Sequence, residues 1–151
     1  MVLDELTTVA LTLVLLRVSW IDIKSFRLPD VWTLPLIAAG LGLALIGVGV
    51  PLMASLIAGT FAFLIFWALG SIYHKRTGRE GLGLGDAKLF AASGTWLGYE
   101  ALPYVLLIST GGALLFSLLY KPDRSRRIAF GPWLALGFWI TWVAVRFTHF
   151  A

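Results

Sequence analysis

Residues 11–40 read LTLVLLRVSWIDIKSFRLPDVWTLPLIAAG, in which parts of two apolar runs are separated by a short loop with two basic residues. A membrane-spanning helix needs about 20 predominantly apolar residues. Backbone polar groups within hydrocarbon must be paired inside the segment, so such runs have to be helical. The stretch therefore predicts two membrane helices joined by a tight turn.

The composition of the whole chain is also typical of a membrane protein. Of its 151 residues, 59% are hydrophobic and only 13% are charged, whereas about 25% of the residues of a soluble domain are charged. The absence of cysteine excludes a thiol nucleophile, disulfides and cysteine-ligated metals, and two separated histidines make no convincing metal cluster. We therefore expect no metal or other cofactor. The net charge of +4 does not indicate nucleic acid, because the basic residues lie between apolar runs and are better explained as topology signals.

Six apolar stretches follow one another along the chain, approximately at residues 3–21, 31–49, 51–72, 83–98, 101–120 and 128–147. Five are long enough to cross a bilayer, which takes about 17–25 residues, and the fourth is shorter. The predicted fold is an all-α membrane bundle of about six transmembrane helices in a single domain. Several glycines are suited to close helix packing, namely those at 40, 42, 47, 49, 111 and 112.

Basic residues lie on alternate loops between these stretches. The second and fourth loops contain none, whereas the first, third and fifth contain Lys24, Arg27, Lys75, Arg76, Arg79, Lys121, Arg124, Arg126 and Arg127. The positive-inside rule then places these three loops in the cytoplasm and both termini on the outer side. Arg146, near the C-terminus, is the contrary charge. We expect a multi-pass protein of the plasma (inner) membrane.

Five acidic residues fall on the predicted cytoplasmic side. Asp123 lies within the basic fifth loop and is explained as a solvated charge, and of the other four Asp22 is the hardest to explain structurally. It ends the first predicted helix, where the helix dipole disfavours a carboxylate, and its surroundings, SWIDIKSF, contain no capping motif. Carboxylates at the edge of membrane helices are costly and usually face the bundle interior. Asp22 is therefore a candidate functional residue.

The other three acids have simpler explanations. Asp30 follows Pro29 and precedes VWTLPL, which favours a role as the N-cap of the second helix. Glu80 is explained as a solvated loop charge. Asp86 is compatible with a cap on the fourth helix, because helix N-termini favour anions, and Lys88 is compatible with a lysine that reaches lipid headgroups.

Asp22 and Asp86 nevertheless fall at helix ends on the same predicted face of the bilayer, so the two carboxylates can meet. Two carboxylates in one site do not both ionise easily and share a proton, which is the resting state of an aspartic protease. Gly83 and Gly85 lack side chains, so the backbone before Asp86 either bends to admit a substrate strand or forms a plain loop. The sequence leaves both interpretations open.

Three blocks carry a resemblance to a known family: WIDIKSFRLPDVWTLPL, EGLGLGDAKLFAASGTWLG and AFGPWLALG. Together they resemble the signature blocks of the type IV prepilin leader peptidases, which are integral-membrane aspartic proteases of the GxGD class. The resemblance extends in order from about residue 18 to about residue 140. GLGD alone would be weak, and the combination of blocks makes the resemblance specific.

The resemblance implies roles for several residues. Asp22 and Asp86 match the two catalytic aspartates of the family, Gly83 and Gly85 the glycines of GxGD, and Lys88 the lysine that commonly follows. Positions that fall in similar blocks, near the site but without a defined role, are Pro29, Asp30, Glu80 and residues 130–132.

The resemblance also implies a substrate class, a prepilin or pseudopilin precursor with a short basic leader followed by an apolar helix and cut at that junction. One ionised aspartate would take a proton from water, while the protonated one hydrogen-bonds the scissile carbonyl. Many bacterial members carry a cysteine-rich cytoplasmic domain and also methylate the new N-terminus. Because this chain has no cysteine and begins directly at the first apolar stretch, we expect the peptidase core alone, without methyltransferase activity.

Three alternatives stay open at this point. A presenilin-like protease shares the GxGD aspartate, but its Tyr-Asp and Pro-Ala-Leu motifs do not occur in this sequence. A proton-linked carrier would use intramembrane acids, although carriers usually place them near the midplane between repeated halves. A non-catalytic membrane scaffold for pilus or secretion assembly would need neither aspartate.

Overall fold

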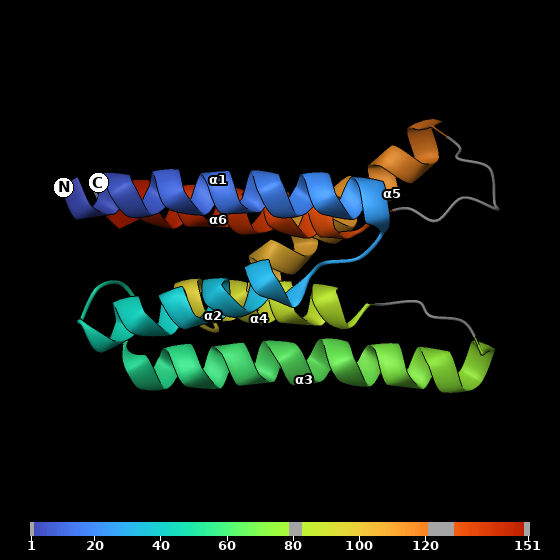
Figure 1. Cartoon of the computed structure of the whole chain (residues 1–151), viewed down its shortest axis with the longest axis horizontal. Helices are drawn as coiled ribbons and strands as arrows, with labels where there is room; N and C mark the ends of the chain where they lie inside the picture. Colours follow the sequence, from blue (N-terminus) through green and yellow to red (C-terminus); the bar gives the residue numbers. More distant parts are fainter. Residues whose placement is uncertain (1, 79–82, 121–128, 150–151) are drawn as a thin grey trace. The chain divides into compact units, whose positions relative to one another are not determined.

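The computed structural model describes residues 2–78, 83–120 and 129–149 of the chain. Within these ranges it forms no strand and six α-helices (Figure 1): α1 Val2–Ser25, α2 Asp30–Leu45, α3 Leu52–Thr77, α4 Leu84–Leu97, α5 Leu102–Tyr120 and α6 Gly131–His149. Each helix lies over one of the six predicted apolar stretches, so the all-α prediction is confirmed. Glu80 and the basic segment 121–127 lie outside the described residues.

Three of the described helices are long and apolar enough to cross a membrane by length and composition, at Glu5–Ser25, Leu52–Thr77 and Leu102–Tyr120. Large hydrophobic side chains are widely exposed on them, including Met53 and Leu107. A soluble monomer rarely exposes so much contiguous apolar surface, whereas a surface that faces lipid tails does. The chain is therefore a multi-pass membrane protein.

α2 is shorter than its apolar stretch predicted. The stretch extends to residue 49, but the helix ends at Leu45 after 16 residues. The reason lies in Gly47 and Gly49, which have φ angles of 76° and 82°, a left-handed conformation that glycine adopts without steric cost and a helix excludes. The prediction that these two glycines pack helices together is wrong, because they form the turn after α2.

Of the other four glycines in that prediction, two lie close to a neighbouring helix within the described residues and two do not. A Cβ atom at Gly40 would meet the side chains of Thr95 and Trp96, and one at Gly112 would meet the ring of Trp133. These two glycines do allow close packing. By contrast, Gly42 and Gly111 have no neighbour within 4 Å of the Cβ position among the described residues.

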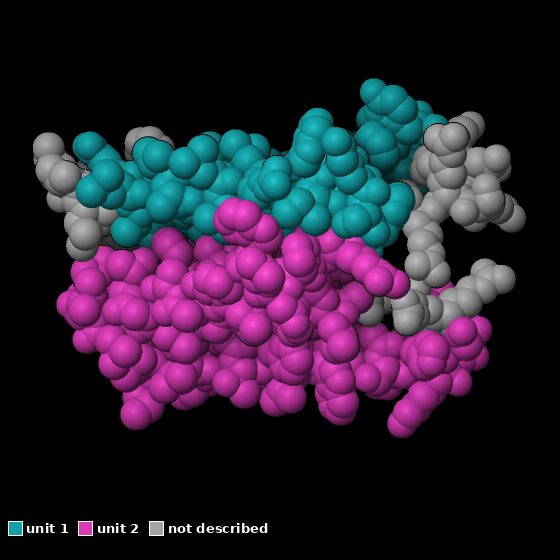
Figure 2. Space-filling model, in the orientation of Figure 1, with its two compact units in different colours: residues 1–26, 104–151 teal, residues 27–103 magenta. Residues whose placement is uncertain are grey.

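The chain divides into two compact units, shown in different colours in Figure 2: unit 1 contains residues 1–26 and 104–151, and unit 2 contains residues 27–103. In unit 1, α1 packs along α6 (Figure 1). The buried side chains recur at intervals of three and four residues, with Leu11, Leu15 and Val18 on α1 and Leu134 and Phe138 on α6. This spacing places them on one face of each helix, so the two faces form the core of unit 1.

In unit 2, α4 packs against both α2 and α3, and every residue from Leu89 to Leu97 is buried. Small residues bring the backbones of α3 and α4 into contact, because a Cβ atom at Gly94 would lie 2.7 Å from the carbonyl oxygen of Ala58 and 2.9 Å from the nitrogen of Gly59. Such small-residue contacts are typical of helix pairs in membranes. α4 is thus the central helix of the unit that carries Asp86.

A buried serine also joins α3 to the end of α4. The hydroxyl of Ser55 donates a 2.7 Å hydrogen bond to the carbonyl oxygen of Thr95, which is one of the last four carbonyls of α4 and has no partner further along its own helix. We expect Ser55→Ala to lower the free energy of unfolding by about 1 kcal/mol, since it leaves this carbonyl buried and unpaired.

Ser93→Ala is the matched control for this prediction. Ser93 is equally buried in unit 2, but its hydroxyl donates to Phe90 within the same helix. Unfolding of both variants in detergent, followed by circular dichroism during a denaturant titration, measures the difference. Equal stability of the two variants would contradict the assigned role of Ser55.

Candidate active site

The carboxylate of Asp22 is held by the beginning of a distant helix. Asp22 lies near the end of α1, is only 5% exposed and accepts a 3.0 Å hydrogen bond at Oδ2 from the backbone N–H of Gly131. Gly131 is the first residue of α6, where the free N–H groups and the helix dipole favour a negative charge. The dipole at the C-terminal end of α1 disfavours the charge of this carboxylate, and the dipole and free N–H groups at the beginning of α6 offset that effect.

Gly131 is fitted to this contact. A Cβ atom at this position would lie 2.6 Å from Oδ2 and 2.9 Å from Cγ of Asp22, so any other residue would force the carboxylate or the beginning of α6 to move. Pro132 follows in the first turn of α6, where the missing N–H of proline costs nothing. Residues 130–132, predicted only to lie near the site, thus include the direct partner of Asp22.

Asp86 lies at the beginning of a helix as well. It is the third residue of α4, and its Oδ2 accepts a hydrogen bond from the backbone N–H of Gly83 at 3.4 Å. A carboxylate at this position satisfies a free N–H group and is favoured by the helix dipole. The capping interpretation of Asp86 is confirmed, and its catalytic role stays a prediction.

The two motif glycines have different surroundings. Gly85 lies directly against the segment that leads into α2, because a Cβ atom there would be 3.1 Å from the carbonyl oxygen and 3.3 Å from the Cα atom of Leu28. Gly83 has an ordinary extended backbone, with φ −75° and ψ 148°, and its nearest neighbour would be the Asp86 carboxylate at 3.5 Å. Close packing inside unit 2 therefore requires a glycine at position 85 and not at position 83.

We expect Gly85→Ala to lower the free energy of unfolding by about 1–3 kcal/mol, because the backbone of Leu28 would have to move. Gly83→Ala should change it by less than about 0.5 kcal/mol, since the added methyl group meets no close neighbour. Parallel thermal melts in detergent compare the two. A Gly83→Ala variant as unstable as Gly85→Ala would show that the contact with Leu28 is not the reason for the glycine.

The prediction that Asp30 caps α2 is wrong. Pro29 occupies the N-cap position, no side chain caps the helix, and Asp30 is the first helical residue. Its carboxylate instead pairs with the ammonium group of Lys88 on α4. This ion pair joins the beginnings of α2 and α4, and because Asp30 is largely exposed the pair contributes at most about 1 kcal/mol.

The structure thus groups the predicted site residues into two sets. Asp22 lies with residues 130–132 in unit 1, while Gly83, Gly85, Asp86, Lys88, Pro29 and Asp30 lie at the beginnings of α2 and α4 in unit 2. Asp22 and Asp86 belong to different units, and their meeting as a dyad stays a prediction. Glu80 falls outside the described ranges, within which no group of three or more acids and histidines is placed to hold a metal ion.

Comparison with known proteins identifies the family of the chain. Residues 9–118 match the type IV leader peptidase family, a range that contains both Asp22 and Asp86. The chain belongs to the type IV leader peptidase family. The resemblance found in the three sequence blocks is therefore confirmed.

Several members of this family are similar to the chain over most of its length, and each is named prepilin leader peptidase/N-methyltransferase. The protein from Aeromonas salmonicida is 42% identical over 139 residues, which are 89% of this chain and 48% of that protein. The Neisseria gonorrhoeae protein is 38% identical over 134 residues, 89% of this chain and 47% of that protein. The chain thus spans about half the length of the curated relatives it matches. No solved structure matches it.

Proposed function

We propose that this leader peptidase family member is a membrane aspartic endopeptidase that removes the basic leader of prepilin-like or pseudopilin-like precursors. The observation that carries the proposal is the family match over residues 9–118, which includes both aspartates. The hydrogen bonds that Asp22 and Asp86 accept from backbone N–H groups at helix beginnings add support. Such bonds fix the direction of each carboxylate without using a second side chain.

In the proposed reaction, Asp22 and Asp86 act together on a water molecule. The ionised aspartate takes a proton from the water, which attacks the scissile carbonyl, while the protonated aspartate donates a hydrogen bond to the developing oxyanion. The tetrahedral diol then collapses, and a proton passes to the leaving amine. No covalent intermediate with the protein forms.

We further propose that the chain spans the plasma (inner) membrane about six times. Both termini would lie on the outer side, and the two aspartates would lie at the cytoplasmic side. Basic residues at the helix ends near the candidate site support this orientation. Lys24 lies in the last turn of α1, just after Asp22, and Lys75 and Arg76 lie in the last turn of α3, which precedes α4. The positive-inside rule assigns such ends to the cytoplasm, where the basic leader of a precursor would also lie.

The proposal is tested by reconstituting the purified chain in lipid vesicles with a precursor that has a basic leader and an apolar helix. We expect a single cut at the junction of the two, located by mass spectrometry of the products. Methylation of the new N-terminus is scored separately, because the names of the relatives carry both activities. An intact precursor after prolonged incubation with folded chain would overturn the proposal, and proton flux in the same vesicles would then favour a carrier.

A further inference from the structure

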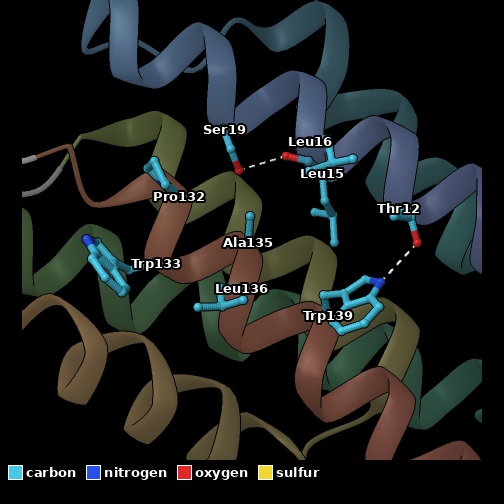
Figure 3. Close-up of a pocket in the computed structure, with 9 residues that line it drawn as sticks. All are labelled: Thr12, Leu15, Leu16, Ser19, Pro132, Trp133, Ala135, Leu136 and Trp139. Atoms are coloured by element: carbon cyan, nitrogen blue, oxygen red, sulfur yellow. Dashed lines mark hydrogen bonds between the residues drawn. The ribbon is translucent and has the colours of Figure 1, made fainter.

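Unit 1 contains a groove between α1 and α6 that takes no part in the chemical steps proposed above. It has a volume of 440 Å³, within the range of about 300–1,000 Å³ typical of ligand sites. Figure 3 shows its lining side chains, which come from two turns of each helix: Thr12, Leu15, Leu16, Ser19, Pro132, Trp133, Ala135, Leu136 and Trp139. We call this feature the α1–α6 groove.

The two hydroxyl groups of the groove and the indole N–H of Trp139 already have partners. The hydroxyl of Thr12 donates to the carbonyl oxygen of Thr8 and accepts a 2.9 Å hydrogen bond from the indole N–H of Trp139. The hydroxyl of Ser19 donates to the carbonyl oxygen of Leu15 at 2.8 Å (Figure 3). The groove therefore offers an occupant apolar contact and little else, which selects a hydrocarbon-like surface over a headgroup or a polar peptide.

One end of the groove lies next to Asp22. Ser19 precedes Asp22 by three residues on α1, a rise of about 4.5 Å, and Pro132 follows Gly131, whose N–H binds the Asp22 carboxylate. From there the groove extends back along α1 to Thr12, about 10 Å further at 1.5 Å per residue. An occupant of the groove that continued past Ser19 would reach the candidate catalytic carboxylate.

We propose that the α1–α6 groove binds the first turns of the precursor's apolar helix, directly after the bond that is cut. This inference rests on the proposed function, because it needs Asp22 at the scissile bond. The occupant must then be apolar, begin at Asp22 and extend towards the bilayer interior, and the apolar helix of a precursor meets all three conditions. A lipid acyl chain shares the chemistry of the groove but has no reason to end at a carboxylate.

A kinetic experiment on the whole chain in vesicles tests the docking. Leu136 lines the groove and is 43% exposed, so Leu136→Trp fills the groove without disturbing the core. We expect this variant to raise KM for the precursor roughly tenfold and to leave kcat unchanged, since only binding of the apolar helix is obstructed. Leu13→Trp is the control, because Leu13 is exposed on α1 but does not line the groove.

A cross-linking experiment shows whether the precursor or lipid occupies the groove, and it tests docking independently of cleavage. A photoreactive phenylalanine analogue replaces Leu136, or Leu13 as control, in an Asp86→Asn chain embedded in phosphatidylethanolamine–phosphatidylglycerol vesicles with the precursor. We expect adducts with the apolar segment of the precursor from position 136 and not from position 13. Lipid adducts alone, or equal yields at both positions, would overturn the inference even if the wild-type chain cuts the precursor. If position 136 forms adducts with the precursor but the wild-type chain does not cut the precursor, the docking inference would stand and the proposed function would be refuted.

Discussion

Asp22→Asn and Asp86→Asn are each expected to reduce precursor cleavage by roughly 10²- to 10⁴-fold, the usual contribution of a general acid or base. Asparagine keeps the size of the side chain but can neither accept a proton from water nor carry the shared one. Its amide oxygen can still accept the hydrogen bonds from Gly131 and Gly83 that the carboxylates accept. Loss of activity should therefore occur without loss of fold.

Single-turnover cleavage of a reconstituted precursor, with thermal melts of the same samples, measures this prediction. Glu100→Gln is the control, because it removes an acid on the exposed loop between α4 and α5 that the predicted topology places on the outer side. It should cleave at the wild-type rate. Wild-type cleavage by either aspartate variant would remove the dyad from the mechanism, whatever the geometry around the other aspartate.

Gly131→Ala is expected to lower kcat by about 10²-fold while KM changes little, because it acts on Asp22 without touching the substrate. The added methyl group would lie 2.6 Å from Oδ2 of Asp22, so either the carboxylate or the beginning of α6 has to move. A displacement of a reacting group by about 1 Å is enough to reduce the rate about 10²-fold. We therefore predict that Gly131 is a positioning residue for Asp22.

Gly111→Ala provides the comparison within unit 1. Gly111 lies in α5 and has no described neighbour within 4 Å of its Cβ position, so the substitution should leave both kcat and stability close to wild type. A purely structural role of Gly131 would lower the melting temperature and the fraction of active molecules but leave kcat per folded molecule unchanged. Active-site titration with a slow-binding aspartic protease inhibitor counts those molecules, and an unchanged kcat would contradict the positioning role.

The helices could be predicted from the sequence because the bilayer demands so much of each segment. A run such as residues 101–120 has to pair its own backbone, and apolar length alone then locates the helix, seen as α5 at Leu102–Tyr120. The end of α2 was harder to predict from the sequence. Gly47 and Gly49 occur among apolar residues, where glycine is equally suited to close packing or to a turn, and only the packed structure shows their left-handed backbone.

The candidate site was predictable in its residue types and not in its contacts. The partner of the Asp22 carboxylate, Gly131, is 109 residues further along the chain. The sequence around Asp22 therefore gave no sign of it. Asp30 looked like an N-cap because aspartate after a break favours that position, but Pro29 takes the position and Lys88 attracts the carboxylate to α4. The need for glycine at position 85 came from Leu28, an ordinary leucine that no motif distinguishes.

The pairing of α1 with α6 has a consequence for how the protein is made. Ribosomes deliver helices to the membrane in order, so α1 is inserted while the partner of its buried face is still untranslated. Until α6 is inserted, the face of α1 that carries Leu11, Leu15 and Asp22 contacts lipid or other helices instead. A half-finished chain would lack the backbone N–H of Gly131 that orients Asp22, so under the proposed function it would not cleave precursors until its synthesis is complete.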